Sequence, residues 1–323
     1  MNIIRCYDTK YLQYYRPLAA AISPLYQENS LAYYREYLQS DWRDESFVVV
    51  LGAQILARVY MTVSANAKQI CYWGLPLQIE IAEDLTERAH KGCWKVLLKE
   101  FQRWQQTGLY QRWVYQPSSL TLDPMALWLL QQGYGCQLAT VQQIELMQSS
   151  EQLSADLRPV YLSNIEWGQA NIKYHLLDKS NATSGCLEAM RLFHIRIAGR
   201  ETRSSESWRW QEQMLITGEA FALYGESQDG ELISTGFFIY NSSRCYYGVG
   251  VYDRDKFSVP VSHDLVWRAM MHAKSLGCQS FEFGEVYFAG LPHPHGDAAS
   301  EKELTISHFK RGFGGQILLK PTF

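Results

Sequence analysis

The sequence predicts an α+β fold in which one unit, made of a strand hairpin, a strand, a helix, a strand, a helix and a strand, occurs twice. Two similar hairpins begin at Phe47 and Phe221. Nearly identical runs close the copies, Gly133-Tyr-Gly-Cys-Gln-Leu138 and Gly312-Phe-Gly-Gly-Gln-Ile317. The offset between the copies is nearly constant until a loop is inserted after Glu285. A duplicated unit of this kind predicts two similar domains.

In the first copy the hairpin is followed by a short aromatic strand over 69–74, and then by a helix with periodic apolar residues. The apolar face of this helix, which Gly108 closes, consists of Leu85, Ala89, Cys93, Leu97, Phe101 and Trp104. A strand over 112–116 and a short helix over 124–132 follow. Each element therefore has its own local signal of periodicity or termination.

The second copy repeats this order, with a strand over 244–248, a helix that ends at Gly277, a strand over 279–283 and a helix over about 303–311. Between the copies, residues 150–217 read as mostly helical. We therefore expect an N-terminal domain over 1–150, a helical connector over 151–217 and a C-terminal domain over 218–323 that carries the Phe309-Lys-Arg-Gly-Phe-Gly-Gly315 motif.

Composition excludes several classes of protein. The chain has 323 residues, 47% of them hydrophobic, which excludes disorder as its main state. Its 30 basic and 33 acidic residues exclude a general polycation. The 7 cysteines form no Cys-x-x-Cys pair, which indicates reduced thiols in a cytoplasmic protein. We see no secretory signal and no apolar run of roughly 18 residues that would span a bilayer.

Three segments of the second copy resemble a known family: Ser262-His-Asp-Leu to Ser-Leu-Gly277, Phe281-Glu-Phe-Gly284 and His308-Phe-Lys-Arg-Gly-Phe-Gly-Gly315. With the order of elements, they resemble the Fem family of peptidyltransferases within the GNAT superfamily, although Glu282 stands where Asp is usual. The resemblance implies two tandem α/β/α units with mixed, mostly antiparallel sheets. It also implies a cytoplasmic enzyme that transfers an acyl or aminoacyl group to an amine of a cell-envelope or polysaccharide precursor, with aminoacyl-tRNA as donor.

The loop that would bind the donor's phosphates indicates which acyl donor the protein can use. An acetyl-CoA enzyme of this fold holds the pyrophosphate on a glycine-rich loop at a helix N-terminus. The corresponding stretches, 252–263 and 75–84, contain no glycine. We therefore expect no firmly bound cofactor, and aminoacyl-tRNA or acyl-CoA as the donor. A CoA-dependent N-acyltransferase with an atypical loop and a non-catalytic binding module remain the alternatives.

Candidate catalytic residues lie near the C-terminus. Lys310 is a cation that could stabilise a developing oxyanion, although Lys310 and Arg311 also suit a solvated helix end. Family resemblance marks the Phe309-Lys310 pair as functional. Glu282, which strand alternation places opposite its aromatic neighbours, and Glu285 could accept the amine proton. The alternative is that both carboxylates are exposed or paired.

Candidate substrate contacts come from the preceding strand and loop. The phenols of Tyr246 and Tyr247 lie where the sheet would open, and core packing is the alternative for both. Arg254 and Lys256 are cations in the glycine-free loop.

The inserted loop carries His293-Pro-His295-Gly-Asp297, a spacing that could bind a metal. We favour a loop over the cleft and expect no metal.

Four cations recur at steps of four on the long helix of the first copy: Lys91, Lys95, Lys99 and Arg103. This spacing puts them on one face of the helix. They form the best local candidate for contact with tRNA or with an anionic membrane surface, and a solvated helix face is the alternative.

Overall fold

The computed structural model describes residues 1–14, 23–117, 121–291 and 298–323. The chain forms two compact units. Unit 1 comprises Met1–Pro17, Leu38–Ala139 and Leu319–Phe323, and unit 2 comprises Leu18–Tyr37 and Thr140–Leu318.

Unit 1 is built on two four-stranded sheets. The first has the order β1-β3-β4-β7, from β1 (Asn2–Arg5), β3 (Phe47–Leu51), β4 (Gln54–Tyr60) and β7 (Gln78–Ile81). The second has the order β2-β5-β6-β8, from β2 (Arg43–Asp44), β5 (Thr62–Ser64), β6 (Gln69–Cys71) and β8 (Arg112–Trp113). The 3-10 turn η1 (Tyr11–Gln13) follows β1.

Two helices complete the core of unit 1, α2 (Glu87–Gln106) and α3 (Pro124–Gln131). Thr86 caps α2, because its side chain accepts a hydrogen bond from the backbone three residues on. Cys93, Leu97 and Phe101 recur every four residues and are fully buried against the strands. Asp123 caps α3 in the same way. Sequence periodicity and caps thus account for both helices.

Unit 2 contains a seven-stranded sheet in the order β10-β11-β12-β13-β14-β9-β15. Its strands are β9 (Gln137–Glu145), β10 (Lys173–Leu177), β11 (Ala220–Glu226), β12 (Leu232–Tyr240), β13 (Arg244–Tyr252), β14 (Ser280–Glu285) and β15 (Gln316–Thr322). The first residues of β9 and the last of β15 belong to unit 1. β13 and β14 are parallel, whereas β10–β11, β11–β12, β12–β13 and β14–β9 are antiparallel. The sheet is therefore mixed and mostly antiparallel, as predicted.

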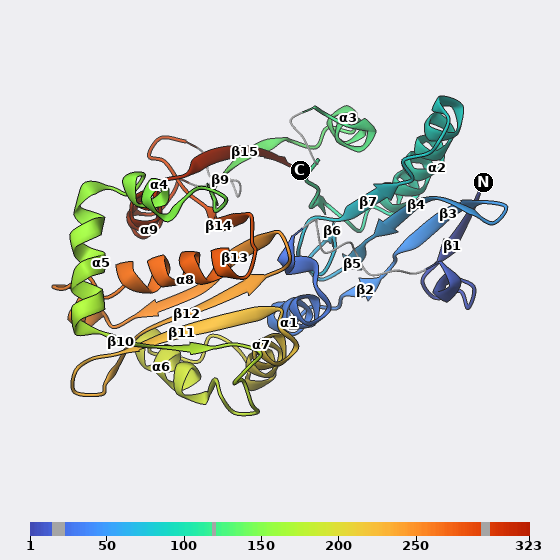
Figure 1. The fold of residues 1–323 in the computed structure, drawn as a ribbon. Coiled ribbons are helices and arrows are strands. Elements are labelled where there is room, and N and C mark those ends of the chain that lie inside the picture. The colour runs from blue at the N-terminus through green and yellow to red at the C-terminus, as the bar shows by residue number, and fades with distance from the viewer. Residues whose placement is uncertain (15–22, 118–120, 292–297) are drawn as a thin grey trace. The chain divides into compact units, whose positions relative to one another are not determined.

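Helices cover both faces of this sheet (Figure 1). On one face lie α5 (Pro159–Asn171) and α8 (His263–Ser275), which bury Phe221 and Phe238. On the other lie α6 (Glu188–Ala198) and α7 (Ser205–Thr217), which pack on Ala222 and Phe237. Neighbouring residues of one strand enter different cores because side chains alternate. The remaining elements are η2 (Pro24–Tyr26), α1 (Glu28–Leu38), α4 (Ser150–Ala155), η3 (Arg254–Lys256) and α9 (Glu301–Arg311).

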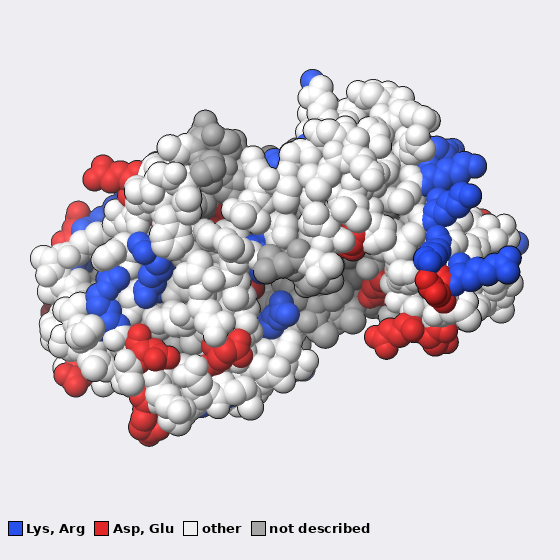
Figure 2. All heavy atoms as spheres, turned by 90° about the horizontal axis from the view of Figure 1, so that it is seen from above, with Lys and Arg blue, Asp and Glu red and all other residues white. Residues whose placement is uncertain are grey.

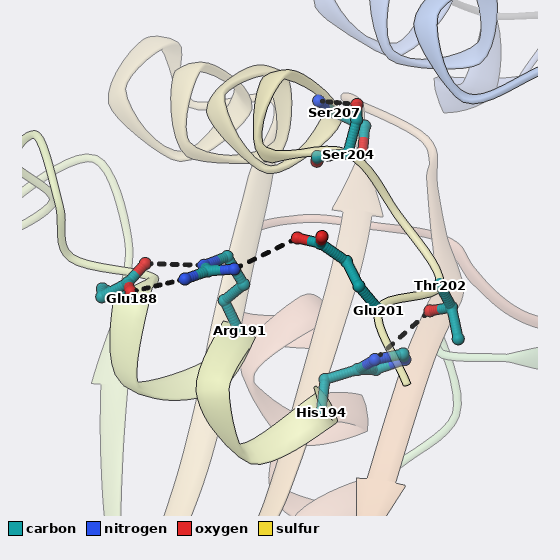
Figure 3. A network of polar contacts seen from close by, with 7 residues as sticks. All are labelled: Glu188, Arg191, His194, Glu201, Thr202, Ser204 and Ser207. Carbon is teal, nitrogen blue, oxygen red and sulfur yellow. Dashed lines mark hydrogen bonds and ion pairs between the residues drawn. The ribbon is translucent and has the colours of Figure 1, made fainter. Parts of the chain in front are cut away.

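A polar network fixes the loop between α6 and α7 (Figure 3). The guanidinium of Arg191 donates to both carboxylate oxygens of Glu188 at 2.8 Å and to Glu201 at 3.2 Å. One turn further along α6, His194 Nδ1 lies 3.4 Å from the hydroxyl of Thr202. The loop is thereby tied to the helix that precedes it.

This loop holds α1 on unit 2. Arg203 donates to the hydroxyl of Tyr33 at 3.0 Å, and its guanidinium lies 5.7 Å from the ring centre of Trp208. Ser204 donates to Glu36 at 2.8 Å. A helix from the N-terminal part of the chain is therefore part of the unit built by the C-terminal part.

The repeated order of elements is confirmed, with both predicted hairpins and helices present. Some details differ. The strand predicted over 112–116 is the two-residue β8. The mostly helical segment 151–217 also contains β10, which pairs with β11 at the edge of the sheet. This segment lies wholly within unit 2. In the part of the chain that the structure describes, no helix is long and apolar enough to cross a membrane.

Candidate functional site

The two sides of β14 carry different chemistry. Phe281 and Phe283 are fully buried in the core beneath α8. Glu282 has the opposite orientation, because side chains alternate along a strand. Its Cα pairs with that of Tyr246 on the parallel neighbour β13. The predicted orientation of Glu282 thus brings a carboxylate beside a phenol.

Lys310, in the last turn of α9, points toward the end of β14. Its Nζ donates to the carbonyl oxygen of Glu285 at 2.9 Å. The buried side chain of Gln142 donates to the carbonyl oxygens of Lys310, at 2.9 Å, and of Gly314, at 2.7 Å. The turn that ends α9 is therefore held in place from β9, and the ammonium group is aimed at a defined point.

Burial changes the acidity of this ammonium group. It lowers the pKa of Lys310 from 10.5 to about 8, against the opposing effect of the Glu285 carboxylate. The side chain is still mostly cationic at neutral pH, but it holds its proton far less tightly than an exposed lysine does. It is placed to stabilise a nearby negative charge or to exchange a proton.

Two phenols complete the cluster around β14. The hydroxyl of Tyr287 donates to the carboxylate of Glu285. Burial raises the pKa of Tyr246, and the carboxylates of Glu282 and Glu285 raise it further. Gly284 has a φ of 71°, and a Cβ there would lie 3.1 Å from the Tyr246 hydroxyl. The close approach of the phenol therefore favours glycine at this position.

Tyr34 on α1 adds a third phenol. Burial raises its pKa well above the usual value, and Tyr246 is the neighbour with the largest further effect. Sequence reasoning missed Tyr34, Tyr287 and Gln142. Tyr287 could have been noticed two residues after Glu285, but nothing local marks Tyr34 or Gln142, which reach the cluster from distant parts of the sequence.

Together, Lys310, Glu282, Glu285, Tyr246 and Tyr287 combine one cation of lowered pKa, two carboxylates and two neutral phenols. Such a group can neutralise a developing oxyanion and accept a proton from an attacking amine. An ammonium group has three donors, and the contact with the Glu285 carbonyl engages one of them. The structure thus brings together the three predicted catalytic residues and one of the two predicted tyrosines.

Tyr247 lies elsewhere. It follows Tyr246 on β13 and therefore faces the core under α8, where its ring packs on Phe283 at 5.7 Å between centroids. Its hydroxyl lies 2.7 Å from that of Tyr252. The core-packing alternative describes Tyr247, whereas Tyr246 lies near the carboxylates of Glu282 and Glu285.

An aromatic cluster fills the region where pairing between β13 and β14 ends after three residue pairs. The His263 ring, at the start of α8, lies 4.4 Å from that of Tyr161 and 5.3 Å from that of Phe309. Phe313 stacks on Phe283 at 5.4 Å. Burial lowers the pKa of His263 to about 4, so this ring is neutral at physiological pH. The ring of Phe309 thus packs in this aromatic cluster and helps to hold α9 in place.

Arg254 and Lys256 lie on the exposed turn η3 and do not join the cluster. Arg254 lines a hollow of about 290 Å³ with Arg196, Glu231 and Asp253. Lys256 Nζ lies 3.7 Å from the Glu231 carboxylate. Lys256 thus belongs to a surface ion-pair group, which Arg254 borders.

The predicted loop motif with His293, His295 and Asp297 lies outside the described residues. Among the residues that are described, no three His, Cys, Asp or Glu side chains gather as metal ligands.

The basic stripe, Lys91, Lys95, Lys99 and Arg103, is exposed along α2 in unit 1. Lys91 pairs with Glu87 at 2.5 Å and Arg103 with Glu100 at 2.9 Å. Figure 2 shows Lys and Arg side chains gathered over this helix.

No protein-family model and no curated protein matches the sequence. Solved structures resemble the fold. FemX has a TM-score of 0.60 and 11% identity, over 90% of each chain. A tandem GNAT protein from the clavulanic acid biosynthesis pathway has a TM-score of 0.55 and 12% identity, over 96% of this chain and 90% of that one. L-PGS from Bacillus licheniformis has a TM-score of 0.51 and 13% identity, over 86% and 83%. The chain therefore has a Fem-like, tandem GNAT fold.

Proposed function

We propose that unit 2 transfers an aminoacyl or acyl group to an amine, with the cluster around Lys310 as its active site. The observation that carries this proposal is the largely buried ammonium of Lys310, whose Nζ lies 2.9 Å from the Glu285 carbonyl and whose pKa is lowered to about 8 near the Glu285 carboxylate. A buried, oriented cation beside proton acceptors is costly to maintain, and such arrangements concentrate at functional sites.

The chemistry assigns a role to each group. The neutral amine attacks the carbonyl carbon of the donor, so that a C–N bond forms and an oxyanion develops, which Lys310 stabilises. Glu285 or Glu282 takes the proton that the amine releases. The oxyanion then collapses to the carbonyl, the bond to the leaving oxygen or sulfur breaks, and the leaving group takes the proton from that carboxyl group. Tyr246, beside the two carboxylates, orients the acceptor.

The donor we favour is aminoacyl-tRNA. Residues 252–263, which precede and enter α8, lack the glycines that a pyrophosphate loop uses. The adjacent region where β13 and β14 stop pairing contains the packed rings of Tyr161, His263 and Phe313. The similar folds include FemX and a putative lysylphosphatidylglycerol synthetase, and these names support an aminoacyl group as the group transferred. We propose an amine of a cell-envelope or polysaccharide precursor as acceptor, in the cytoplasm.

The test uses two radiolabelled donors, aminoacylated bulk tRNA and acetyl-CoA, each with a mixture of soluble and lipid-linked envelope precursors. We expect label to move from tRNA to an amine product in the wild type. The control Lys302→Met, which replaces an exposed lysine on the same helix, should behave in the same way. We expect Lys310→Met to lose about 100-fold or more of the rate.

Transfer from acetyl-CoA alone would establish the CoA-dependent alternative. The tandem GNAT protein, whose structure was solved without AcCoA, would then be the relevant comparison for the loop. Failure to bind either donor would instead favour a non-catalytic binding module. Undiminished transfer by Lys310→Met would refute the assigned site.

A further inference from the structure

The basic stripe on α2 borders an apolar surface that its sequence alone does not reveal. A hollow of about 800 Å³ lies between α2 and α3 in unit 1. Lys91, Lys95 and Lys99 line it together with the apolar Leu98 and Pro124. Cations and hydrocarbon therefore share one face of the unit.

The α3 helix extends the apolar part of this face. It contains no charged residue, and Leu127 and Leu130, three residues apart, are 46% and 40% exposed. On a helical wheel Leu127 is about 60° and Leu130 about 120° from Pro124, which lines the hollow, so Leu127 lies nearer the hollow and Leu130 further round the exposed side of α3. Figure 2 shows uncharged surface next to the Lys and Arg side chains over α2. Exposed leucines beside lysines make an amphipathic surface.

The charge of this surface is arranged in a line. With a rise of about 1.5 Å per residue, the basic stripe from Lys91 to Arg103 extends for about 18 Å. Lys91 and Arg103 have acidic partners on the helix, whereas Lys95 and Lys99 have none among the described residues. The acidic residues Glu83, Asp84 and Glu87 lie before the stripe begins. The middle of the line, at Lys95 and Lys99, therefore presents positive charge without an acidic partner among the described residues.

These observations favour a membrane over a nucleic acid as the partner. Sequence-independent binding of single strands uses exposed aromatic rings on which bases stack. The Trp94 and Trp128 side chains at the hollow are only 9% and 7% exposed, and Trp128 packs edge-on against Trp113 at 5.4 Å. Contact with a phosphate backbone would not stabilise exposed leucines, whereas burial of their side chains in the acyl region of a bilayer is favourable in free energy.

We propose that the α2–α3 face of unit 1 docks on the surface of a membrane that contains anionic phospholipids. Lys91, Lys95 and Lys99 contact lipid phosphates while Leu127 and Leu130 enter the interface. Either signal alone gives weak attachment, whereas a basic patch combined with apolar insertion gives stable but reversible binding. The inference does not depend on the proposed transferase activity.

The test is co-sedimentation of the full chain with vesicles of phosphatidylcholine alone or of equal parts phosphatidylcholine and phosphatidylglycerol. We expect binding only to the second kind, and its loss at high salt. Because each lysine near an anionic surface contributes about fivefold, the triple variant Lys91→Gln, Lys95→Gln, Lys99→Gln should bind about 100-fold more weakly. The matched control, Lys10→Gln, Lys173→Gln, Lys302→Gln, removes the same charge from other exposed positions and should bind like the wild type.

A second variant separates the apolar contribution. The double variant Leu127→Ser, Leu130→Ser keeps every charge and should also weaken binding to the mixed vesicles. The binding that is left should be more sensitive to salt than that of the wild type. Circular dichroism checks that these surface variants remain folded. The proposal is overturned by equal binding to both vesicle types or by an equal loss of affinity in the stripe and control variants. It is also overturned if Leu127→Ser, Leu130→Ser binds the mixed vesicles as tightly as the wild type. Binding of bulk tRNA through the stripe, without vesicle binding, would assign the face to nucleic acid instead.

Discussion

Replacing Lys310 with Met should stabilise the protein at pH 7 and destabilise it at high pH. The folded state lowers the pKa of this lysine from 10.5 to about 8. Each factor of ten is worth about 1.4 kcal/mol, so keeping the ammonium charged costs the folded state about 3 kcal/mol. Met removes this cost but leaves the Glu285 carbonyl without its donor, a loss of about 1–2 kcal/mol. The net gain at pH 7 is about 1–2 kcal/mol.

The sign reverses with pH because the two states lose the proton in different ranges. Below pH 8 both states hold it and the full cost applies. Between pH 8 and pH 10.5 the folded state loses the proton first, so the wild type gains stability relative to Lys310→Met. Above this window the variant lacks only the hydrogen bond and is the less stable protein.

Urea unfolding at pH 7 and pH 10 measures both differences. Lys302→Met, on the exposed side of α9, is the control, and its difference from the wild type should be the same at the two pH values. All other titrating groups are common to the proteins and cancel. A difference between the wild type and Lys310→Met that does not change with pH would refute the buried, charged lysine on which the site depends.

Three further predictions follow from packing and burial. Gly312→Ala places a methyl group on the Tyr161 ring and should destabilise unit 2 by about 1–3 kcal/mol in urea unfolding, whereas Gly135→Ala, in open space, should change little. Tyr246→Phe should lower transfer activity with little loss of stability, and Tyr247→Phe should keep activity but lose about 1 kcal/mol with its bond to Tyr252; the reverse pattern would exchange their roles. Folding lowers the pKa of His263 from 6.5 to about 4, so its contribution to stability is complete above pH 6.5 and is lost as the pH falls toward 4. In the wild type the free energy of unfolding should therefore fall between pH 7 and pH 5 by roughly 1–2 kcal/mol more than in His263→Phe, allowing for partial exposure.

The repeated elements could be predicted because each has a local cause. Helix α2 follows from its four-residue apolar spacing and its Thr86 cap, and the hairpins follow from two β-rich runs around a turn. Strand alternation was enough to orient Glu282 correctly between Phe281 and Phe283. Local rules of this kind work where neighbours in the sequence determine the structure.

The rest depends on contacts between distant parts of the chain. Alternation shows that Tyr246 and Tyr247 face opposite sides, but only the packing of α8 decides which of them enters the core. Tyr34 reaches the site because α1 joins unit 2, where the loop of Arg203 holds it. A strand as short as β10 needs its partner β11 to be recognised.

The single-turnover rate of transfer at saturating donor tests the central claim most directly, because it isolates chemistry from binding. We predict that Lys310→Met binds the donor as tightly as the wild type but transfers about 100-fold to 1,000-fold more slowly, while Lys302→Met matches the wild type in both measurements. An unchanged single-turnover rate in Lys310→Met would contradict the assignment of the site around Lys310.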